Sequence, residues 1–153
     1  MFLRSLFTAL LLTLAAPAFA AGEWTNRWDN GDMVAVTPNY QLEIRIAQTP
    51  NEGTWGHLVI PIKAEQLDEL NKHRKDKLFP YIDVAVEVDK YYRNAQGHIL
   101  ADELVIKTDL DVRQWEGLKK GSRLVIRLPD RTEYRETLRG SGAALRKVEK
   151  RYR

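Results

Sequence analysis

The sequence predicts a mainly β protein, an antiparallel β-sandwich or partly closed barrel with two or three short helices. Alternating apolar and polar residues dominate the middle of the chain, and each alternating run has one polar face. A parallel sheet covered on both faces would instead show continuous apolar runs. Helical periodicity is confined to short segments, which favours small helices packed on a sheet.

Strand alternation is clearest in five stretches, at 40–46, 58–62, 82–88, 124–128 and 132–138. We expect the apolar side of each stretch to face a common core, because strand side chains point alternately to opposite faces. The positions assigned to the core by this alternation include Ile44, Val84, Val86 and Ile126.

Turn residues separate several of these stretches. The segments 51–53 and 94–97 each end in glycine, and we expect both to connect strands as hairpin turns. Pro129-Asp130-Arg131 is expected to form a third turn, between the last two strands.

Three segments have helical character. Residues 64–77 carry a narrow apolar stripe. Residues 111–119 are expected to form a short helix that is ended by Lys119, Lys120 and Gly121, a usual helix stop. Ser141 is a candidate cap for a terminal helix that has one strongly basic side. Its apolar side is expected to carry Ala144, Val148 and Tyr152.

Residues 1–20 have the pattern of a secretory signal peptide. Arg4 precedes an apolar run from Leu6 to Leu14, and Ala18-Phe19-Ala20 offers small residues at the cleavage positions. We therefore expect a single exported domain over 21–153, with no membrane-spanning segment after cleavage. The absence of paired arginines near the start favours the general secretory route, and a cysteine-free exported chain suits a bacterial periplasm.

Few residues suit catalysis. There is no cysteine, which excludes disulfides and thiolate metal sites, and His57, His73 and His98 lack the spacing of zinc ligands. The two serines after the signal peptide, Ser122 and Ser141, lie outside a nucleophile elbow motif. We expect no enzyme activity, no metal and no cofactor.

Charge is distributed unevenly along the chain. Residues 139–153 carry a net charge of +5, while residues 21–138 carry −3. This polarity can attract an anionic surface such as an envelope polymer, lipid head groups or an acidic protein. Export makes nucleic acid an unsuitable partner.

The expected hairpin near the C-terminus is the first candidate binding surface. Alternation predicts that its arginines lie on the outward face, where guanidinium groups capture carboxylates or phosphates. Glu133 would share this face and reduce its positive potential. The arginines of this candidate anionic-ligand face are Arg123, Arg127, Arg131, Arg135 and Arg139.

Tryptophans provide an alternative surface. Trp24 and Trp28 lie in a polar context, where full burial is difficult, and Trp55 follows a predicted turn. Exposed aromatic rings stack on sugars or form the centre of a protein interface. These three residues are the aromatic alternative to the basic face.

A family pattern covers about a quarter of the mature chain. The segment Leu110 to Val148 reads LDVRQWEGLKKGSRLVIRLPDRTEYRETLRGSGAALRKV and combines a short helix ending in Lys-Lys-Gly, an apolar strand, a hairpin and Leu-Arg-Gly. It resembles the C-terminal part of invasion-associated locus B proteins, although it lacks the usual cysteines of that family and an aromatic residue after Gly140. The resemblance implies a β-sandwich and an exported, non-enzymatic role at the envelope or a host surface. It assigns no catalytic residue.

Together these features predict a non-enzymatic periplasmic binding or adaptor protein that recognises an anionic envelope component or a partner protein. The alternative is an inhibitor or immunity protein that blocks a hydrolase acting in the periplasm. Neither pattern nor composition separates these two functions.

Overall fold

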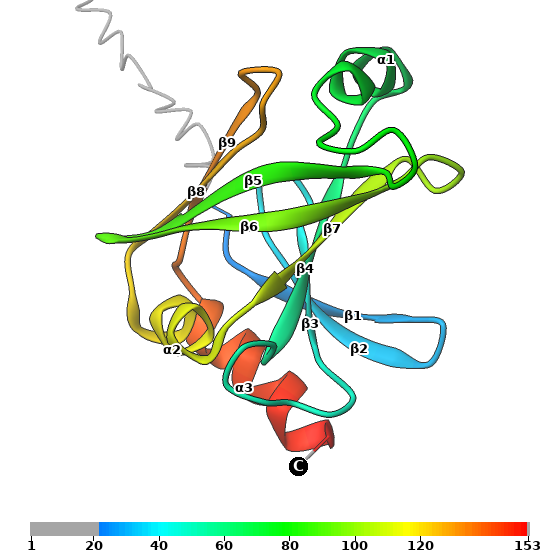
Figure 1. The fold of residues 1–153 in the computed structure, drawn as a ribbon. Helices are drawn as coiled ribbons and strands as arrows, with labels where there is room; N and C mark the ends of the chain where they lie inside the picture. Colours follow the sequence, from blue (N-terminus) through cyan, green and yellow to red (C-terminus); the bar gives the residue numbers. More distant parts are fainter. Residues whose placement is uncertain (1–21, 153) are drawn as a thin grey trace, which may run out of the picture.

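The computed structural model describes residues 22–152 (Figure 1). The predicted signal peptide, residues 1–20, and the predicted mature N-terminus at residue 21 lie outside the described residues. No helix within 22–152 has the length and apolar character needed to cross a membrane.

The described chain forms one antiparallel sheet that curls into a half-barrel, which confirms the predicted fold class. The strand order is β1-β2-β3-β4-β7-β6-β5-β8-β9, so most sequence neighbours pair directly. In chain order the strands are β1 (Thr25–Asp29), β2 (Asp32–Val36), β3 (Glu43–Ile46), β4 (Gly56–Pro61), β5 (Tyr81–Val88), β6 (Tyr91–Leu100), β7 (Val105–Leu110), β8 (Arg123–Arg127) and β9 (Glu133–Thr137).

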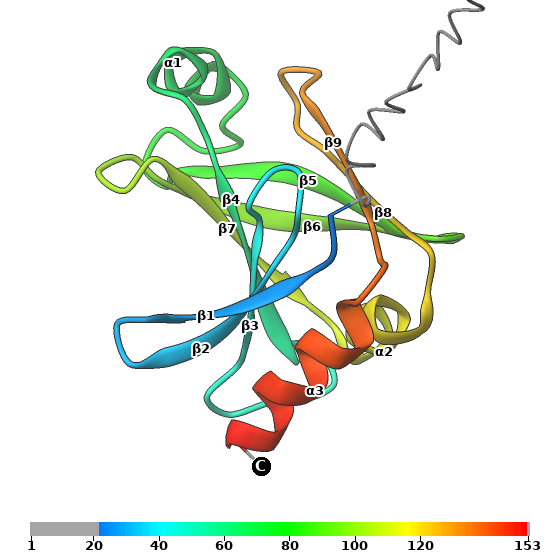
Figure 2. The ribbon, with the colours of Figure 1, turned by 180° about the vertical axis from the view of Figure 1, so that it is seen from behind.

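Three helices lie at the two ends of the half-barrel. Helices α2 (Val112–Lys120) and α3 (Ser141–Tyr152) are side by side at one end, and α1 (Ala64–Lys72) stands at the other (Figures 1 and 2). Helix α2 begins where the sequence predicts, because the Asp111 carboxylate accepts the Gln114 N–H at 2.7 Å. Helix α1 ends five residues earlier than predicted, and residues 73–80 form a loop.

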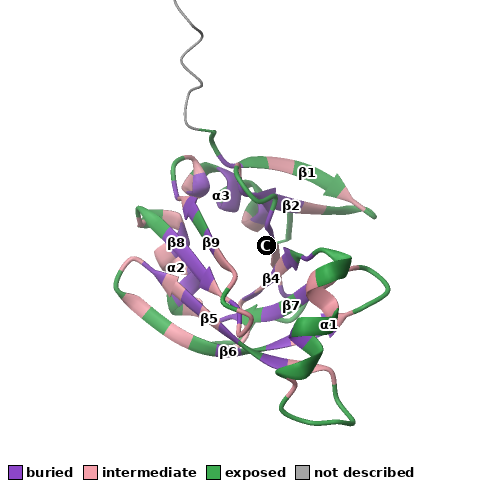
Figure 3. Ribbon diagram, turned by 90° about the horizontal axis from the view of Figure 1, so that it is seen from above, coloured by how far each residue is buried: buried purple, intermediate pink, exposed green. Residues whose placement is uncertain are grey.

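The core occupies the inner face of the curled sheet. Ile44, Val84, Val86 and Ile126 are all fully buried, as alternation predicts. Buried residues alternate with less buried ones along β4, β5 and β9, and Figure 3 colours the ribbon by this burial. The apolar faces of α2 and α3 complete the core through residues that include Trp115, Leu118, Leu145 and Val148.

Hydrogen bonds join the two edges of the half-barrel. The Trp24 N–H donates to the Arg139 carbonyl at 3.2 Å, and the Trp24 indole donates to the Thr137 carbonyl at 2.7 Å. The buried Glu136 carboxylate accepts from the Thr37 hydroxyl at 2.7 Å and the Tyr40 N–H at 2.6 Å. The segments that flank β1 and β2 are thereby fixed to β9.

The prediction of a turn at 94–97 is wrong, because these residues lie inside the long strand β6. Gly97 is required there by packing: a Cβ at this position would lie 2.5 Å from Val84 Cγ2 and 2.8 Å from Ile106 Cγ2. The turn between β5 and β6 occurs instead at Asp89, which has a φ of 51°.

Candidate functional site

The arginines of the β8–β9 hairpin point outward as predicted, but carboxylates on the same face pair with them. Arg123 lies 3.2 Å from Glu87, and Arg127 lies 2.9 Å from Glu87 and 3.1 Å from Glu133. Arg135 pairs with the second oxygen of Glu133. Charges of opposite sign therefore alternate across this face, which reduces its attraction for an external anion.

The pKa values of these groups reflect the pairing. The hydrogen bond from Arg127 lowers the pKa of Glu87, and the same bond raises the pKa of Arg127. Both effects show that Glu87 is charged at neutral pH and holds the positive charge of Arg127 locally. The side chains remain in contact with solvent, so the pairs contribute little to folding stability.

The other two arginines of the predicted basic face do not extend it. Arg139 follows β9 and pairs with Glu23 at 3.0 Å. Arg131 lies in the β8–β9 turn, in the left-handed backbone region with a φ of 70°. The hairpin therefore does not gather its five arginines into one unpaired cluster.

Helix α3 carries exposed cations that form no ion pair with another described residue. Their spacing, i, i+1, i+4 and i+5, places them on one side of the helix, opposite the buried residues. Within residues 22–152 none of them lies within ion-pair distance of a carboxylate. We call this surface the α3 basic face, and its residues are Arg146, Lys147, Lys150 and Arg151.

The one carboxylate of α3 does not neutralise the α3 basic face. Glu149 accepts the Trp115 indole N–H at 2.6 Å and the Lys119 ammonium at 2.9 Å, both from α2. Burial opposes the charge on Lys119, but hydrogen bonds with Glu116 and Glu149 outweigh it and raise the lysine pKa. Glu149 therefore joins α3 to α2, and the cations of the α3 basic face take no part in this hydrogen-bonded group.

Contacts at both ends hold α3 in place. The expected cap at Ser141 is wrong, because Ser141 is the first residue of α3 and its hydroxyl acts as a donor: Oγ lies 2.6 Å from the carbonyl oxygens of Leu118 and Leu138, which share its single proton. At the other end the Tyr152 hydroxyl donates to Asp32 at 2.9 Å and accepts from the Met33 N–H at 2.9 Å. The α3 basic face is therefore presented by a fixed helix. The net charge of +5 over 139–153 indicates this basic helix in the sequence, whereas strand alternation predicts a binding surface on the hairpin.

The aromatic surface predicted from the sequence is only partly formed. The prediction is wrong for Trp24, which is 5% exposed, because its ring packs in the core and its indole finds a backbone acceptor in β9. Trp55 is partly buried and packs against the core. Trp28 is 57% exposed, and the Arg151 guanidinium lies 5.7 Å from the centroid of its ring. One of the three tryptophans thus joins the α3 basic face.

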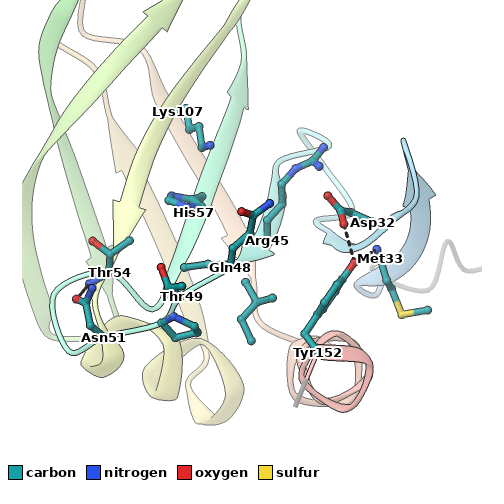
Figure 4. Close-up of a pocket in the computed structure, with 13 residues that line it drawn as sticks. Asp32, Met33, Arg45, Gln48, Thr49, Asn51, Thr54, His57, Lys107 and Tyr152 are labelled. Atoms are coloured by element: carbon teal, nitrogen blue, oxygen red, sulfur yellow. Dashed lines mark hydrogen bonds between the residues drawn. The ribbon is translucent and has the colours of Figure 1, made fainter.

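A hollow of about 960 Å³ adjoins the C-terminal end of α3 (Figure 4). Tyr152 and the start of β2 form one side of it, and the connection from β3 to β4 forms the other. Arg45, His57 and Lys107 lie along the sheet within it, and Gln48 contributes an amide. Its lining is therefore mixed, with charged, amide, hydroxyl and apolar groups.

Two of the ionisable side chains that line this hollow already have acidic partners. Arg45 bonds to Asp29 and to Glu43, and His57 Nδ1 lies 2.8 Å from an Asp109 oxygen. Lys107 is exposed and has no ion-pair partner in the described part of the chain. The hollow thus offers the Lys107 cation beside neutral polar groups and the Asp32 carboxylate, which accepts a hydrogen bond from Tyr152. The described residues hold no group of three His, Asp or Glu side chains that could bind a metal ion.

Comparison with known proteins supports a likeness at the level of the fold. No family model matches the chain, and no curated protein matches it in sequence. Among solved structures, it is similar to the crystal structure of invasion associated protein B from Bartonella henselae, with a TM-score of 0.50 and 13% sequence identity. The match covers 85% of this chain and 94% of that protein. The resemblance inferred from the C-terminal segment is confirmed for the fold, and a sequence identity this low shows the fold alone.

Proposed function

We propose that this chain is a non-enzymatic binding or adaptor protein of the periplasm. It recognises an anionic envelope component, or an anionic partner protein, through the α3 basic face. The observation that carries this proposal is the set of four exposed cations on a fixed helix, none paired with a carboxylate in the described chain. Unpaired guanidinium and ammonium groups are available to carboxylates or phosphates of a ligand.

The arrangement of these cations is unfavourable for the isolated helix. Arg146 and Lys150, and likewise Lys147 and Arg151, are like charges at i, i+4, a spacing that destabilises a helix by a few tenths of a kcal/mol per pair. Cations in the last turn interact favourably with the helix dipole, but Arg146 and Lys147 lie further back. A local conflict of this kind is expected at a binding surface, where an external anion relieves the repulsion.

The surroundings of α3 widen the proposed site. Trp28 adds an exposed ring beside Arg151, and the hollow next to Tyr152 adds Lys107 together with neutral polar groups and the Asp32 carboxylate. A polymer that places its anionic groups on α3 reaches the hollow without leaving the surface of the protein. An anionic glycan or a phosphate-bearing envelope polymer has anionic groups for the α3 basic face and polar groups for the hollow.

Cosedimentation of the mature protein with purified lipopolysaccharide and with cell-wall sacculi tests this function. We expect retention at low salt that falls steeply towards roughly 0.5 M salt, since exposed charges are screened beyond a few ångströms there. Absence of retention on both materials at low salt, together with no complex with an acidic protein, would contradict the proposal. A stoichiometric complex with a periplasmic hydrolase that survives high salt would support the inhibitor function instead.

A further inference from the structure

The loop that follows α1, residues 73–80, exposes two large apolar side chains. Leu78 is 82% exposed and the adjacent Phe79 is 55% exposed. Single exposed apolar residues are common on protein surfaces, but two adjacent ones of this size are a feature of interaction sites. Neither the fold nor the α3 basic face accounts for them.

The exposure of Leu78 and Phe79 belongs to an ordered loop. The Arg74 guanidinium donates to the carbonyl oxygens of Lys77 at 2.9 Å and Phe79 at 3.3 Å. The Asp76 carboxylate accepts the Leu78 N–H at 2.7 Å. These bonds fix the backbone on both sides of Leu78 and keep its side chain out of the core.

Contacts with Tyr81 at the start of β5 hold the 73–80 loop against the sheet. The Lys75 N–H donates to the Tyr81 carbonyl at 3.1 Å, and the Phe79 ring stacks on Tyr81 with centroids 6.1 Å apart. The loop and α1 lie at the end of the half-barrel opposite α2 and α3 (Figures 1 and 2). Leu78 and Phe79 therefore project from the end that the α3 basic face does not use.

The loop that carries the two apolar side chains also carries three cations. Residues 73–80 contain Arg74, Lys75 and Lys77 against one carboxylate, Asp76. Lys75 pairs with Asp83 at 2.6 Å, whereas Lys77 has no ion-pair partner among residues 22–152. The loop thus combines an aliphatic and an aromatic side chain with a local excess of positive charge.

We propose that the 73–80 loop docks on an anionic lipid bilayer, with Leu78 and Phe79 inserted at the interface and Lys77 against the head groups. Apolar side chains next to Lys or Arg are the combination that binds the boundary between head groups and acyl chains. The local positive charge favours an anionic lipid surface over a neutral one. The proposal rests on the exported location of the proposed function, but not on the α3 basic face.

Fluorescence at position 78 tests this docking directly, because the chain has no cysteine and Leu78→Cys can be labelled at one site. The probe is an environment-sensitive dye on the full mature chain, mixed with phosphatidylglycerol-containing vesicles or with pure phosphatidylcholine vesicles. We expect a blue shift with the first vesicles only. The matched control is Tyr92→Cys, because Tyr92 is a large exposed side chain on β6, outside the loop. We expect no shift for a dye at this position.

Cosedimentation with the same vesicles provides the second measurement. The double variant Leu78→Ser, Phe79→Ser is expected to bind phosphatidylglycerol vesicles about tenfold more weakly than the parent, whereas Tyr92→Ser binds like the parent. Absence of binding by the parent, or binding with no blue shift at position 78, would overturn the proposal. If the loop docks on a protein instead of a lipid bilayer, the vesicle measurements will give this negative result.

The two proposals fail in different ways. If the α3 basic face has no ligand, removal of its cations leaves the blue shift at position 78 unchanged. If the loop does not insert, position 78 shows no shift even where the protein is retained on anionic material through α3. Each result is therefore assigned to one surface.

Discussion

The guanidinium of Arg151 lies over the indole ring of Trp28, 5.7 Å from the ring centroid. This contact joins the last turn of α3 to β1 and places an exposed aromatic ring beside the α3 basic face. From the sequence, aromatic and basic surfaces are two alternatives, with the basic one on the hairpin. In the structure, Trp28 and the cations of the α3 basic face form a single surface.

Replacing Trp24 by alanine is expected to destabilise the protein by about 3–5 kcal/mol, because it removes a buried ring and its hydrogen bond to the Thr137 carbonyl. Trp28→Ala is the matched control and is expected to change the free energy of unfolding by less than about 1 kcal/mol. Chemical denaturation followed by circular dichroism measures both. Equal losses for the two variants would contradict the closure of the half-barrel through Trp24.

Gly97→Ala is expected to cost about 1–3 kcal/mol, because its methyl group would overlap Val84 and Ile106. Gly53→Ala is the control: its Cβ would meet only Asn51 Oδ1, at 3.5 Å, and the change is expected to stay within about 0.5 kcal/mol. Unfolding midpoints in urea compare the two. If Gly97→Ala unfolds at the parent's midpoint, close packing is not the reason for glycine in β6.

Glu87 gives a pH-dependent prediction. The hydrogen bond from Arg127 holds the pKa of Glu87 below its ordinary value of 4.5, so its pair stabilises the fold above that value. This contribution is lost as the pH falls through the lowered pKa of the folded state. Glu87→Gln is therefore expected to melt slightly below the parent at about pH 7 and together with it at about pH 2. A gap that persists in acid would contradict the role of this ion pair.

Much of the fold can be predicted from local patterns. Alternation identifies the buried faces of β4, β5 and β9, since period-two burial follows from strand geometry. It fails at Val125 in β8, which is fully buried although it alternates with the outward Arg123 and Arg127. Asp111 marks the start of α2 because the capping interaction is local. The error at Gly97 has a physical cause: glycine marks a turn and a close contact equally well, and only the tertiary neighbours separate them.

The candidate site is harder to predict, because it depends on pairing across the sheet. Glu87 precedes its partner Arg127 by 40 residues, and the register of β5 with β8 brings them together. Trp24 lies in a polar sequence but is buried by contacts with β9, more than a hundred residues away. The sequence shows that α3 is positively charged, but it does not show that Glu149 bonds to Trp115 of α2.

Removal of two cations at a time tests the α3 basic face most directly. One variant combines Lys147→Gln with Arg151→Gln, and the matched variant combines Arg123→Gln with Arg135→Gln on the hairpin. The measurement is the affinity of each for purified lipopolysaccharide at low salt, with thermal melting to confirm that both remain folded. If the α3 basic face binds the ligand, we expect a loss of about tenfold or more for the α3 variant and near-parent binding for the hairpin variant. The reverse order, with binding lost only when the hairpin arginines are replaced, would contradict it.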